Sequence, residues 1–331
     1  SEPDGTEFVA AFKTTVSITE TGIHRPKIVL CNGSKGGRFR QLVKGQDDIR
    51  QDAVMEQVFG YVNSLMRRRR AAAKSERRHK APNAQTLSLV TYHIVPLSPI
   101  TGVLEWVNDT IPFGDYLLDK RKGKGIIQLG AHSRYHQGQW GHGLCRKTLD
   151  AAPKEEKRVV FEEICQNFSP AFRFFFVERF GDDLLAWHKA KMKYTRSCAV
   201  SSIVGHILGI GDRHSHNILL HERTGEVVHI DFGIVFESGK TLPTPEVIPF
   251  RLTRDIVDGM GPTGTDGTFS SSAEETVRIL RDNAGALLTI LSAVVSDPLY
   301  EWKKSAARAR IKQRTVADDD DDDNDDEEAE H

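Results

Sequence analysis

Short apolar runs alternate with turn residues over the first fifty positions of the chain. Each run is short enough, and rich enough in valine, isoleucine or phenylalanine, to form a strand. A later run, followed by Pro96, has the same character. The pattern predicts an antiparallel sheet in the amino-terminal part. The five predicted strands are Phe8–Phe12, Val16–Ile18, Lys27–Cys31, Phe39–Lys44 and Thr86–Val95.

Helical periodicity replaces this alternation in the rest of the chain. Apolar residues recur every three or four positions from about Arg50 to Met66, which predicts an amphipathic helix. Residues 110–210 are mostly helical in pattern, and their last helix stops at Gly209. The chain is therefore predicted to have an α+β fold, with strands first and helices after them. The other predicted helices cover Val159–Phe168, Val200–Leu208, Val277–Leu291 and Pro298–Lys312.

The composition fits a soluble globular protein, because 39% of the 331 residues are hydrophobic and 27% are charged. No apolar run is long enough to cross a membrane, and the first residues do not resemble a signal peptide, so we expect no membrane partner. The four cysteines form no Cys-x-x-Cys pair, which indicates a reducing compartment.

Charge is distributed unevenly along the chain. Eleven of the 46 acidic residues lie between Asp318 and Glu330, so the other 35 face 45 Lys and Arg, and the remainder carries +10. The acidic segment, residues 317–331, cannot bury a core and is predicted to be disordered. A basic run, Arg67–Lys80, is typical of a solvated loop. Such a run also suits a nucleic-acid contact or a nuclear import signal, so a nucleic-acid-binding domain stays open as a hypothesis.

A histidine-rich segment raises the question of a metal site. Its candidate zinc ligands are His132, His136, His142 and Cys145. Their spacing matches no zinc-finger pattern. Three glycines within the segment favour a mobile loop, which is the prediction we adopt.

One polar segment carries the strongest chemical pattern. Asp212 and Asn217 are five positions apart, and Asp231 begins an Asp-Phe-Gly sequence. Protein kinases use residues of these types at this spacing to take the substrate proton and to hold Mg²⁺. Residues 217–221 and 226–230 are predicted to form a β-hairpin, which would bring both metal ligands to one end of two strands. A lone Asp-Phe-Gly sequence is more often a turn, but the Asp212–Asn217 spacing and the Asp-Phe-Gly sequence together favour a kinase-type site.

A second candidate element is the glycine-rich turn at residues 32–37. Its glycines allow backbone N–H groups to approach a phosphate, and Ser34 adds a hydroxyl, although plain hairpins also use such turns. The return strand ends in Lys44. In kinases such a lysine reaches the ATP phosphates and pairs with an acid on the next helix. Asp52, in the first turn of that helix, is the candidate partner, and its charge alone also suits a helix N-terminus.

The short extended piece Gly102–Val107 lies where the strand-rich part meets the helix-rich part. In a kinase the backbone of such a hinge binds the adenine edge. Trp106 could supply an apolar face for the purine, and a core position is the alternative for this residue.

Together these segments resemble the catalytic domain of the phosphatidylinositol 3-kinase-related protein kinases, and within that family the branch of ATM and its fungal orthologues. The sequence Asp212-Arg213-His214 has the Arg and His after the Asp, an order that separates this superfamily from common protein kinases. The resemblance covers most of residues 27–312. The other matching segments are Gln41–Met55, Gly102–Trp106, Thr195–Ser197, Ser201–Gly205 and Val247–Gly261.

The resemblance implies the two-lobed PI3/PI4-kinase fold, with a strand-rich lobe at residues 1–105 and a helical lobe at residues 106–316. It implies transfer of the γ-phosphoryl group of ATP to Ser or Thr, preferably before Gln, with Mg²⁺ as cofactor. The implied setting is DNA-damage checkpoint signalling and telomere maintenance in the nucleus. The implied partners are protein substrates, the rest of a larger chain, a second copy in a homodimer, and a DNA-break sensor complex.

The resemblance also assigns roles to individual residues. Asp212 would orient and deprotonate the substrate hydroxyl, and His214 would stabilise the transferring phosphoryl group. Lys44 would contact the phosphates, with Asp52 as its partner. The remaining assignments are Asn217 and Asp231 for Mg²⁺, and Trp106, Val107 and Leu219 for the adenine.

The sequence contains neither the family's long helical-repeat region nor its short carboxy-terminal segment, so we expect it to be the catalytic part of a larger protein. Two other functions compete with an active kinase of the ATM type: a different kinase of the same family, and a catalytically silent interaction module with this fold. A silent module would normally have lost Lys44, Asp212 or Asp231, and the chain keeps all three.

Overall fold

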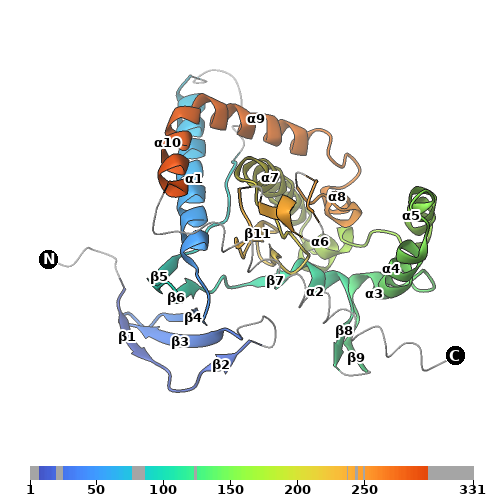
Figure 1. Ribbon diagram of the computed structural model, residues 1–331, viewed down its shortest axis with the longest axis horizontal. Helices are drawn as coiled ribbons and strands as arrows, with labels where there is room; N and C mark the ends of the chain where they lie inside the picture. Colours follow the sequence, from blue (N-terminus) through green and yellow to red (C-terminus); the bar gives the residue numbers. More distant parts are fainter. Residues whose placement is uncertain are drawn as a thin grey trace.

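The computed structural model describes residues 7–19, 25–76, 86–122, 125–236, 238–242, 245–248 and 250–296. The described chain has a sheet with the long helix α1 (Arg50–Glu76) against it, and a larger helical part around a second, smaller sheet (Figure 1). The predicted helix at 298–312 and the acidic segment at 317–331 lie outside the described residues.

The first sheet has six strands, and its order is β1-β3-β4-β6-β5, with β2 paired to β3. All its pairs are antiparallel, which confirms the predicted sheet. Pro96 lies in β5 at the edge of the sheet, where its missing N–H needs no ladder partner. The strands are β1 (Val9–Phe12), β2 (Ser17–Ile18), β3 (Lys27–Gly33), β4 (Arg38–Gly45), β5 (Ile94–Ser98) and β6 (Thr101–Glu105).

The predicted strand Thr86–Val95 is wrong over most of its length, because β5 starts only near its end. Side chains of α1 bind the backbone of this segment instead. Leu89 N–H donates to Asn63 Oδ1 at 2.8 Å, and Asn63 Nδ2–H donates to Leu89 O at 2.9 Å. Tyr92 N–H donates to Glu56 Oε2 at 3.1 Å. A helix thus takes the place of a neighbouring strand, which a hydrophobic pattern cannot show.

The carboxy-terminal part surrounds helix α7 (Leu184–Leu208) and a three-stranded sheet in the order β11-β10-β7. Strands β10 and β11 form the predicted antiparallel hairpin. The strands of this part are β7 (Thr110–Pro112), β8 (Lys120–Lys122), β9 (Gly125–Gln128), β10 (Ile218–His221) and β11 (Val227–His229). The other helices are α2 (Phe113–Leu117), α3 (Ala131–Tyr135), α4 (His142–Ala151), α5 (Lys157–Asn167), α6 (Arg173–Phe180), α8 (Arg254–Met260), α9 (Thr268–Asp282) and α10 (Ala284–Val295), and Ser238–Thr241 forms a 3₁₀ turn.

Helix α7 has a defined start and a defined end. The carboxylate of Asp183 caps it by accepting the N–H groups of Leu185 and Ala186. Gly209 ends it in the left-handed region, with φ of 60°, as the sequence predicted. No helix in the described ranges is long and apolar enough to cross a membrane, α7 included. The buried end of α7 fixes where the segment after it begins.

The basic run Arg67–Lys80 is not the predicted loop over its first ten residues, because α1 continues to Glu76. Tertiary packing supports this extension, since α9 and α10 lie beside α1 (Figure 1). Arg69 Nε donates to Glu275 Oε1 on α9 at 3.0 Å. The rest of the run lies outside the described residues.

Two further expectations need correction. The histidine-rich segment is not a loop, because α3 and α4 occupy most of it. The predicted helix Val277–Leu291 is divided into α9 and α10 at Asn283. The apolar spacing of the sequence continues through Asn283, so it did not show where the helix is interrupted.

Two hydrophobic cores hold the molecule together. The first joins α1 and the segment before β5 to α7 and α9, and Phe232 lies in it. The second is aromatic and centres on Phe172, whose ring lies 4.7 Å from that of Phe113 and 5.2 Å from that of Tyr194. Helix α7 contributes to both cores, so it links the two parts of the fold.

Replacing Asn63 by Ala should lower the free energy of unfolding by about 2–3 kcal/mol, because both backbone groups of Leu89 would lose a buried partner. Denaturant unfolding of wild type and Asn63→Ala measures this loss. Gln57→Ala, on the exposed face of the same helix, is the matched control. Equal losses in the two variants would show that the pairing does not stabilise the fold.

Candidate active site

The segment after α7 places the first predicted catalytic residue, Asp212. Gly211 N–H donates to Ile234 O at 2.9 Å. Asp212 has φ of 55°, a left-handed conformation that a non-glycine residue adopts only when its surroundings support it. Its N–H donates to Glu246 Oε1 at 2.8 Å. Contacts on both sides therefore fix the backbone at Asp212.

Arg213 joins this segment to the Asp-Phe-Gly segment. Its side chain is buried, and its guanidinium donates to the carbonyls of Gly211 at 2.8 Å, Ile230 at 2.7 Å and Asp231. Burial lowers the pKa of Arg213, and the charge of Asp231 opposes that shift. Backbone carbonyls thus satisfy a buried cation, and they tie two chain segments together. Arg213 had no role of its own among the sequence-based predictions.

Asn217 and Asp231, the predicted Mg²⁺ ligands, lie at the same end of the β10–β11 hairpin. Ile230 N–H donates to Asn217 O at 3.1 Å and closes that end. Asn217 Nδ2–H donates to Asp212 O at 2.8 Å and lies 3.4 Å from Asp212 Oδ2. The amide nitrogen faces Asp212, so the amide oxygen is the atom suited to a cation.

The oxygen donors of Asn217 and Asp231 fit Mg²⁺. This ion binds through one or two carboxylates and completes its shell with phosphates and water. Across the described ranges, no three His, Cys, Asp or Glu side chains form a ready-made metal cage. The donor set therefore suits Mg²⁺ that is held jointly with nucleotide phosphates.

His214 has a defined tautomer when it is neutral. Its Nδ1 accepts the N–H of His216 at 3.2 Å, so the ring proton lies on Nε2, which can donate to a phosphoryl oxygen. Helix α2 holds this part of the chain in place. His216 Nε2 is 3.3 Å from Asp115 Oδ1, and Gly114 N–H donates to Ser215 O at 2.9 Å.

Lys44, near the end of β4, is suited to contact phosphates. Burial lowers its pKa, but three nearby carboxylates outweigh burial and hold the pKa above the ordinary value, so the amine is charged. These carboxylates are Asp231, Asp52 and Asp47. The ion pair of Lys44 is with Asp47, at 3.5 Å, where the sequence indicated Asp52. Asp52 acts on Lys44 through its charge.

Asp52 binds the Asp-Phe-Gly segment. Its buried Oδ1 accepts the N–H of Phe232 at 2.8 Å, and Gln51 Nε2–H donates to Phe232 O at 2.5 Å. Burial raises the pKa of Asp52 to about 6. The fully buried ring of Phe232 packs edge to face on Phe59, with centroids 5.2 Å apart. Helix α1 therefore holds this segment by backbone and side chain, and so positions Asp231.

The structure does not bring Ser34 together with Lys44. The register pairs Lys27 with Val43, so Lys44 lies where β3 begins, whereas the glycine-rich turn lies where β3 ends. At about 3.3 Å per residue, about 20 Å of strand separates Arg38 from Lys44. The prediction that Ser34 shares a phosphate with Lys44 is wrong. A lysine at the far end of a return strand cannot lie beside the turn that precedes that strand.

The backbone of the glycine-rich turn is already bound within the chain. Glu7 Oε1 accepts the N–H groups of Lys35 and Gly37, each at 2.9 Å. Ser34 N–H donates to Phe8 O at 2.7 Å. The donors that the sequence assigned to a phosphate thus hold the start of the chain against the sheet.

Trp106, Val107 and Leu219 lie where the two sheets approach each other. The Trp106 side chain belongs to neither of the two described cores, and the Arg40 guanidinium lies 5.1 Å from its ring centroid. Val107 and Leu219 are partly buried against the first core. Trp106 N–H donates to Arg40 O, so about 13 Å of β4 separates the Trp106 level from Lys44. A nucleotide, with its base and phosphates at opposite ends, suits this separation.

Glu56, one turn after Asp52 on α1, is a residue that the sequence-based predictions missed. It is 7% exposed, and Oε2 accepts the N–H of Tyr92. Among the described residues, neither Glu56 Oε1 nor the Tyr92 hydroxyl has a hydrogen-bond partner. Burial raises the pKa of Glu56 to about 8, so the carboxyl is neutral at pH 7. The sequence did contain a signal for Glu56, because this charged residue lies in the apolar stripe of a predicted helix.

The four candidate zinc ligands are not arranged as a metal site. His132 Nε2 is 3.2 Å from Asp255 Oδ2, and its ring stacks on Phe168 at 4.3 Å. The Nε2 of His136 is 3.1 Å from Pro170 O. These contacts give both histidines structural roles. His142 and Cys145 lie in the first turn of α4, and among the described residues no three His, Cys, Asp or Glu side chains are placed to hold a metal.

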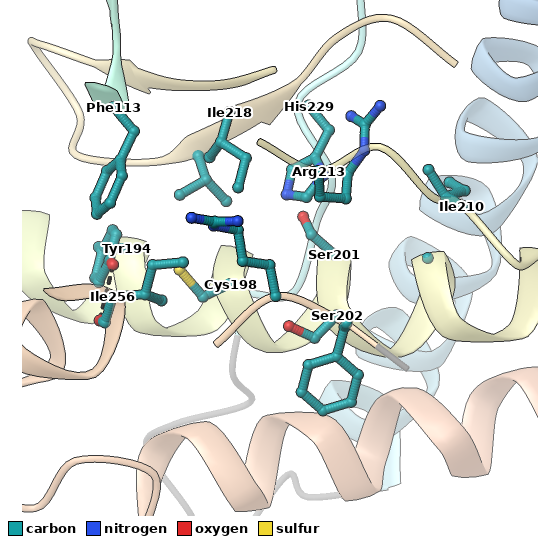
Figure 2. Close-up of a pocket in the computed structure, with 14 residues that line it drawn as sticks. Phe113, Tyr194, Cys198, Ser201, Ser202, Ile210, Arg213, Ile218, His229 and Ile256 are labelled. Carbon is teal, nitrogen blue, oxygen red and sulfur yellow. Dashed lines mark hydrogen bonds between the residues drawn. The ribbon is translucent and has the colours of Figure 1, made fainter. Parts of the chain in front are cut away.

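A separate cavity of about 30 Å³ lies between α7 and the β10–β11 hairpin, with room for one water-sized molecule (Figure 2). Arg213 and His229 line one side, and Ser201 of α7 faces them. Burial and the charge of Arg213 lower the pKa of His229 to about 3, so His229 is neutral. The residues predicted to bind nucleotide or metal do not line this cavity, which is therefore distinct from their site.

The contribution of Glu56 to stability should fall as the pH rises from 5 to 8, by about 2–4 kcal/mol. The folded-state pKa of about 8 lies above the ordinary value of 4.5, so unfolding releases a proton in this range. Glu56→Gln should remove this part of the slope. Denaturant unfolding at several pH values measures it, and Glu274→Gln, on the exposed face of α9, controls for the loss of a carboxyl. An unchanged slope in Glu56→Gln would contradict the assignment.

Comparison with known proteins agrees with this geometry. Residues 38–304 match the family described as phosphatidylinositol 3- and 4-kinase. The chain is 46% identical over 298 residues to the serine/threonine-protein kinase ATM of Arabidopsis thaliana, covering 90% of this chain and 7% of that protein. It spans less than a tenth of that relative's length.

Solved structures give the same result. The structure described as the FAT and kinase domain of CtTel1 superposes with a TM-score of 0.77 at 38% identity, over 94% of this chain and 21% of that chain. The complete CtTel1 dimer with C2 symmetry superposes with a TM-score of 0.76 at 38% identity, over 93% of this chain and 11% of that chain.

Proposed function

Because the chain belongs to the phosphatidylinositol 3- and 4-kinase family, we propose that it transfers the γ-phosphoryl group of ATP to Ser or Thr hydroxyls of proteins, preferably before Gln. One observation carries the proposal: a charged lysine, two carboxylates and an amide lie near one another. The charge of Asp231 acts on Lys44, Arg213 joins the segments of Asp212 and Asp231, and Asn217 donates to Asp212. Phosphoryl transfer needs mainly positioning and charge neutralisation, and this set supplies both.

Each residue has one task in the proposed reaction. Asp212 orients the substrate hydroxyl and accepts its proton. His214 donates its Nε2–H to the transferring phosphoryl group, and the ammonium of Lys44 binds the phosphates. Asn217 and Asp231 would hold Mg²⁺, which would neutralise phosphate charge when bound. Trp106, Val107 and Leu219 contact the adenine.

The charge of the segment after the Asp-Phe-Gly sequence favours a protein substrate over an inositol lipid. A polyanionic headgroup needs clustered Lys and Arg. From Ile234 to Leu252 the chain has Lys240 and Arg251 against two glutamates, a balance of zero. Val247 and Ile248 in this segment are 78% and 73% exposed, an apolar pair better suited to a peptide than to a phosphorylated sugar.

We further infer the cellular role from similarity to ATM and Tel1. DNA-damage checkpoint signalling, telomere maintenance and a nuclear location fit those names. The dimeric CtTel1 structure supports a homodimer of a longer chain. A DNA-break sensor complex as activator is a proposal from family resemblance alone.

Replacing Asp212 by Asn should lower turnover on a Ser-Gln peptide by at least about 100-fold, because the group that accepts the hydroxyl proton is lost. ATP binding should stay within about twofold. Radiolabel transfer by the full-length protein, with nucleotide titration, measures both. Near-normal turnover would remove Asp212 from the mechanism.

The same assay decides the substrate class. The wild-type protein is given phosphatidylinositol vesicles, a Ser-Gln peptide and a matched Ser-Ala peptide. We expect faster phosphorylation of the Ser-Gln peptide than of the Ser-Ala peptide, and no efficient phosphorylation of the vesicles. Efficient lipid phosphorylation would overturn the protein-kinase proposal, and equal rates on the two peptides would remove only the Gln preference.

Trp106→Ala should weaken nucleotide binding by about 1–2 kcal/mol if the indole covers the purine. Trp106→Phe keeps an aromatic face and should lose less. Nucleotide titration with thermal melting separates binding from folding. Unchanged affinity in Trp106→Ala would assign the residue to its contact with Arg40 instead.

A further inference from the structure

Glu246 is a carboxylate outside the predicted site that contacts the backbone of Asp212. It lies in residues 245–248, after the Asp-Phe-Gly sequence and the 3₁₀ turn Ser238–Thr241, and is 34 positions away from Asp212. Its Oε1 accepts the N–H of Asp212 at 2.8 Å, a charge-assisted hydrogen bond of good length.

Two glycines make room for the carboxylate of Glu246. A Cβ built on Gly211 would lie 2.2 Å from Glu246 Oε2, and one built on Gly239 would lie 2.5 Å from the same atom. The backbone of Glu246 is also held, because its N–H donates to Gly239 O at 3.1 Å. The carboxylate is therefore seated in a fitted position between two chain segments.

The conformation of Asp212 explains why its contact with the Glu246 carboxylate is important. With φ of 55°, Asp212 is in a left-handed conformation that is less stable for a residue with a side chain. Its N–H has a fixed direction in that conformation, and Glu246 meets it. Loss of the acceptor would leave this N–H without its partner and allow the backbone to relax, which would turn the Asp212 carboxylate away from the substrate.

We propose that Glu246 is a positioning residue that fixes the backbone of Asp212 for proton transfer. The inference rests on the proposed role of Asp212. Loss of the Glu246 carboxylate would then lower kcat and leave the affinity for ATP unchanged, since Lys44 and Asp231 are held by other contacts.

The test uses Glu246→Ala and Glu246→Gln in the full-length protein. Glu246→Ala should lower kcat by about 10- to 100-fold, with KM for ATP and the ATP Kd within about twofold of wild type. Glu246→Gln keeps an acceptor oxygen and should recover most of the rate. Asp183→Ala is the matched control, because it removes a carboxylate that accepts backbone N–H groups at the start of α7, away from the site.

Gly239→Ala tests the same contact without changing Glu246, because the new methyl group would displace the carboxylate. It should lower kcat in the same way, and it also decides the case if Glu246→Ala does not fold. Normal kcat in Glu246→Ala and Gly239→Ala, or a Glu246→Gln variant as slow as Glu246→Ala, would overturn the proposal. Wild type and Asp212→Asn serve as references: an inactive wild type, or an active Asp212→Asn, would contradict the proposed function and not the role of Glu246 alone.

Discussion

The arrangement of the site depends on the buried guanidinium of Arg213. A cation removed from water is costly unless polar atoms surround it. Here the polar atoms are carbonyls of the two segments that carry Asp212 and Asp231. The hydrogen bonds of the Arg213 guanidinium therefore fix the position of Asp212, the proposed base, relative to Asp231, a proposed Mg²⁺ ligand. The acceptors are backbone carbonyls, so substitution of the neighbouring side chains would not remove them.

Helix α1 supplies the second constraint, and it acts on both sides of the proposed nucleotide site. Its first turn binds the backbone of Phe232 through Gln51 and Asp52. Its middle binds the segment before β5 through Glu56 and Asn63. The helix is thus the common support for the first sheet and for the Asp-Phe-Gly segment, and a shift of α1 would move Asp231 relative to Lys44.

The sequence was informative where chemistry and spacing coincide. Strands β1 to β4 of the first sheet, the β10–β11 hairpin, the end of α7 at Gly209 and the grouping of Asp212 with Asn217 all follow from local pattern. The errors concern relations between distant segments. Ser34 is far from Lys44 because the two residues lie at opposite ends of the β3–β4 hairpin. Lys44 forms its ion pair with Asp47, while the carboxylate of Asp52 accepts the N–H of Phe232. Arg213 and Glu246 bind backbone groups of segments far away in sequence, which leaves no local signature, whereas Glu56 had one in its position on the apolar stripe of a helix.

The burial of Phe232 has a consequence for small molecules that would occupy the proposed nucleotide site. Its ring is fully buried, and both its backbone groups are bound by α1. A compound that needed this phenylalanine to swing out would have to offset roughly 2–3 kcal/mol of lost apolar burial and about 1 kcal/mol for each broken hydrogen bond. Inhibitors of this domain should therefore be sought among compounds that leave Phe232 in place, and selectivity should be built on the side chains around Trp106.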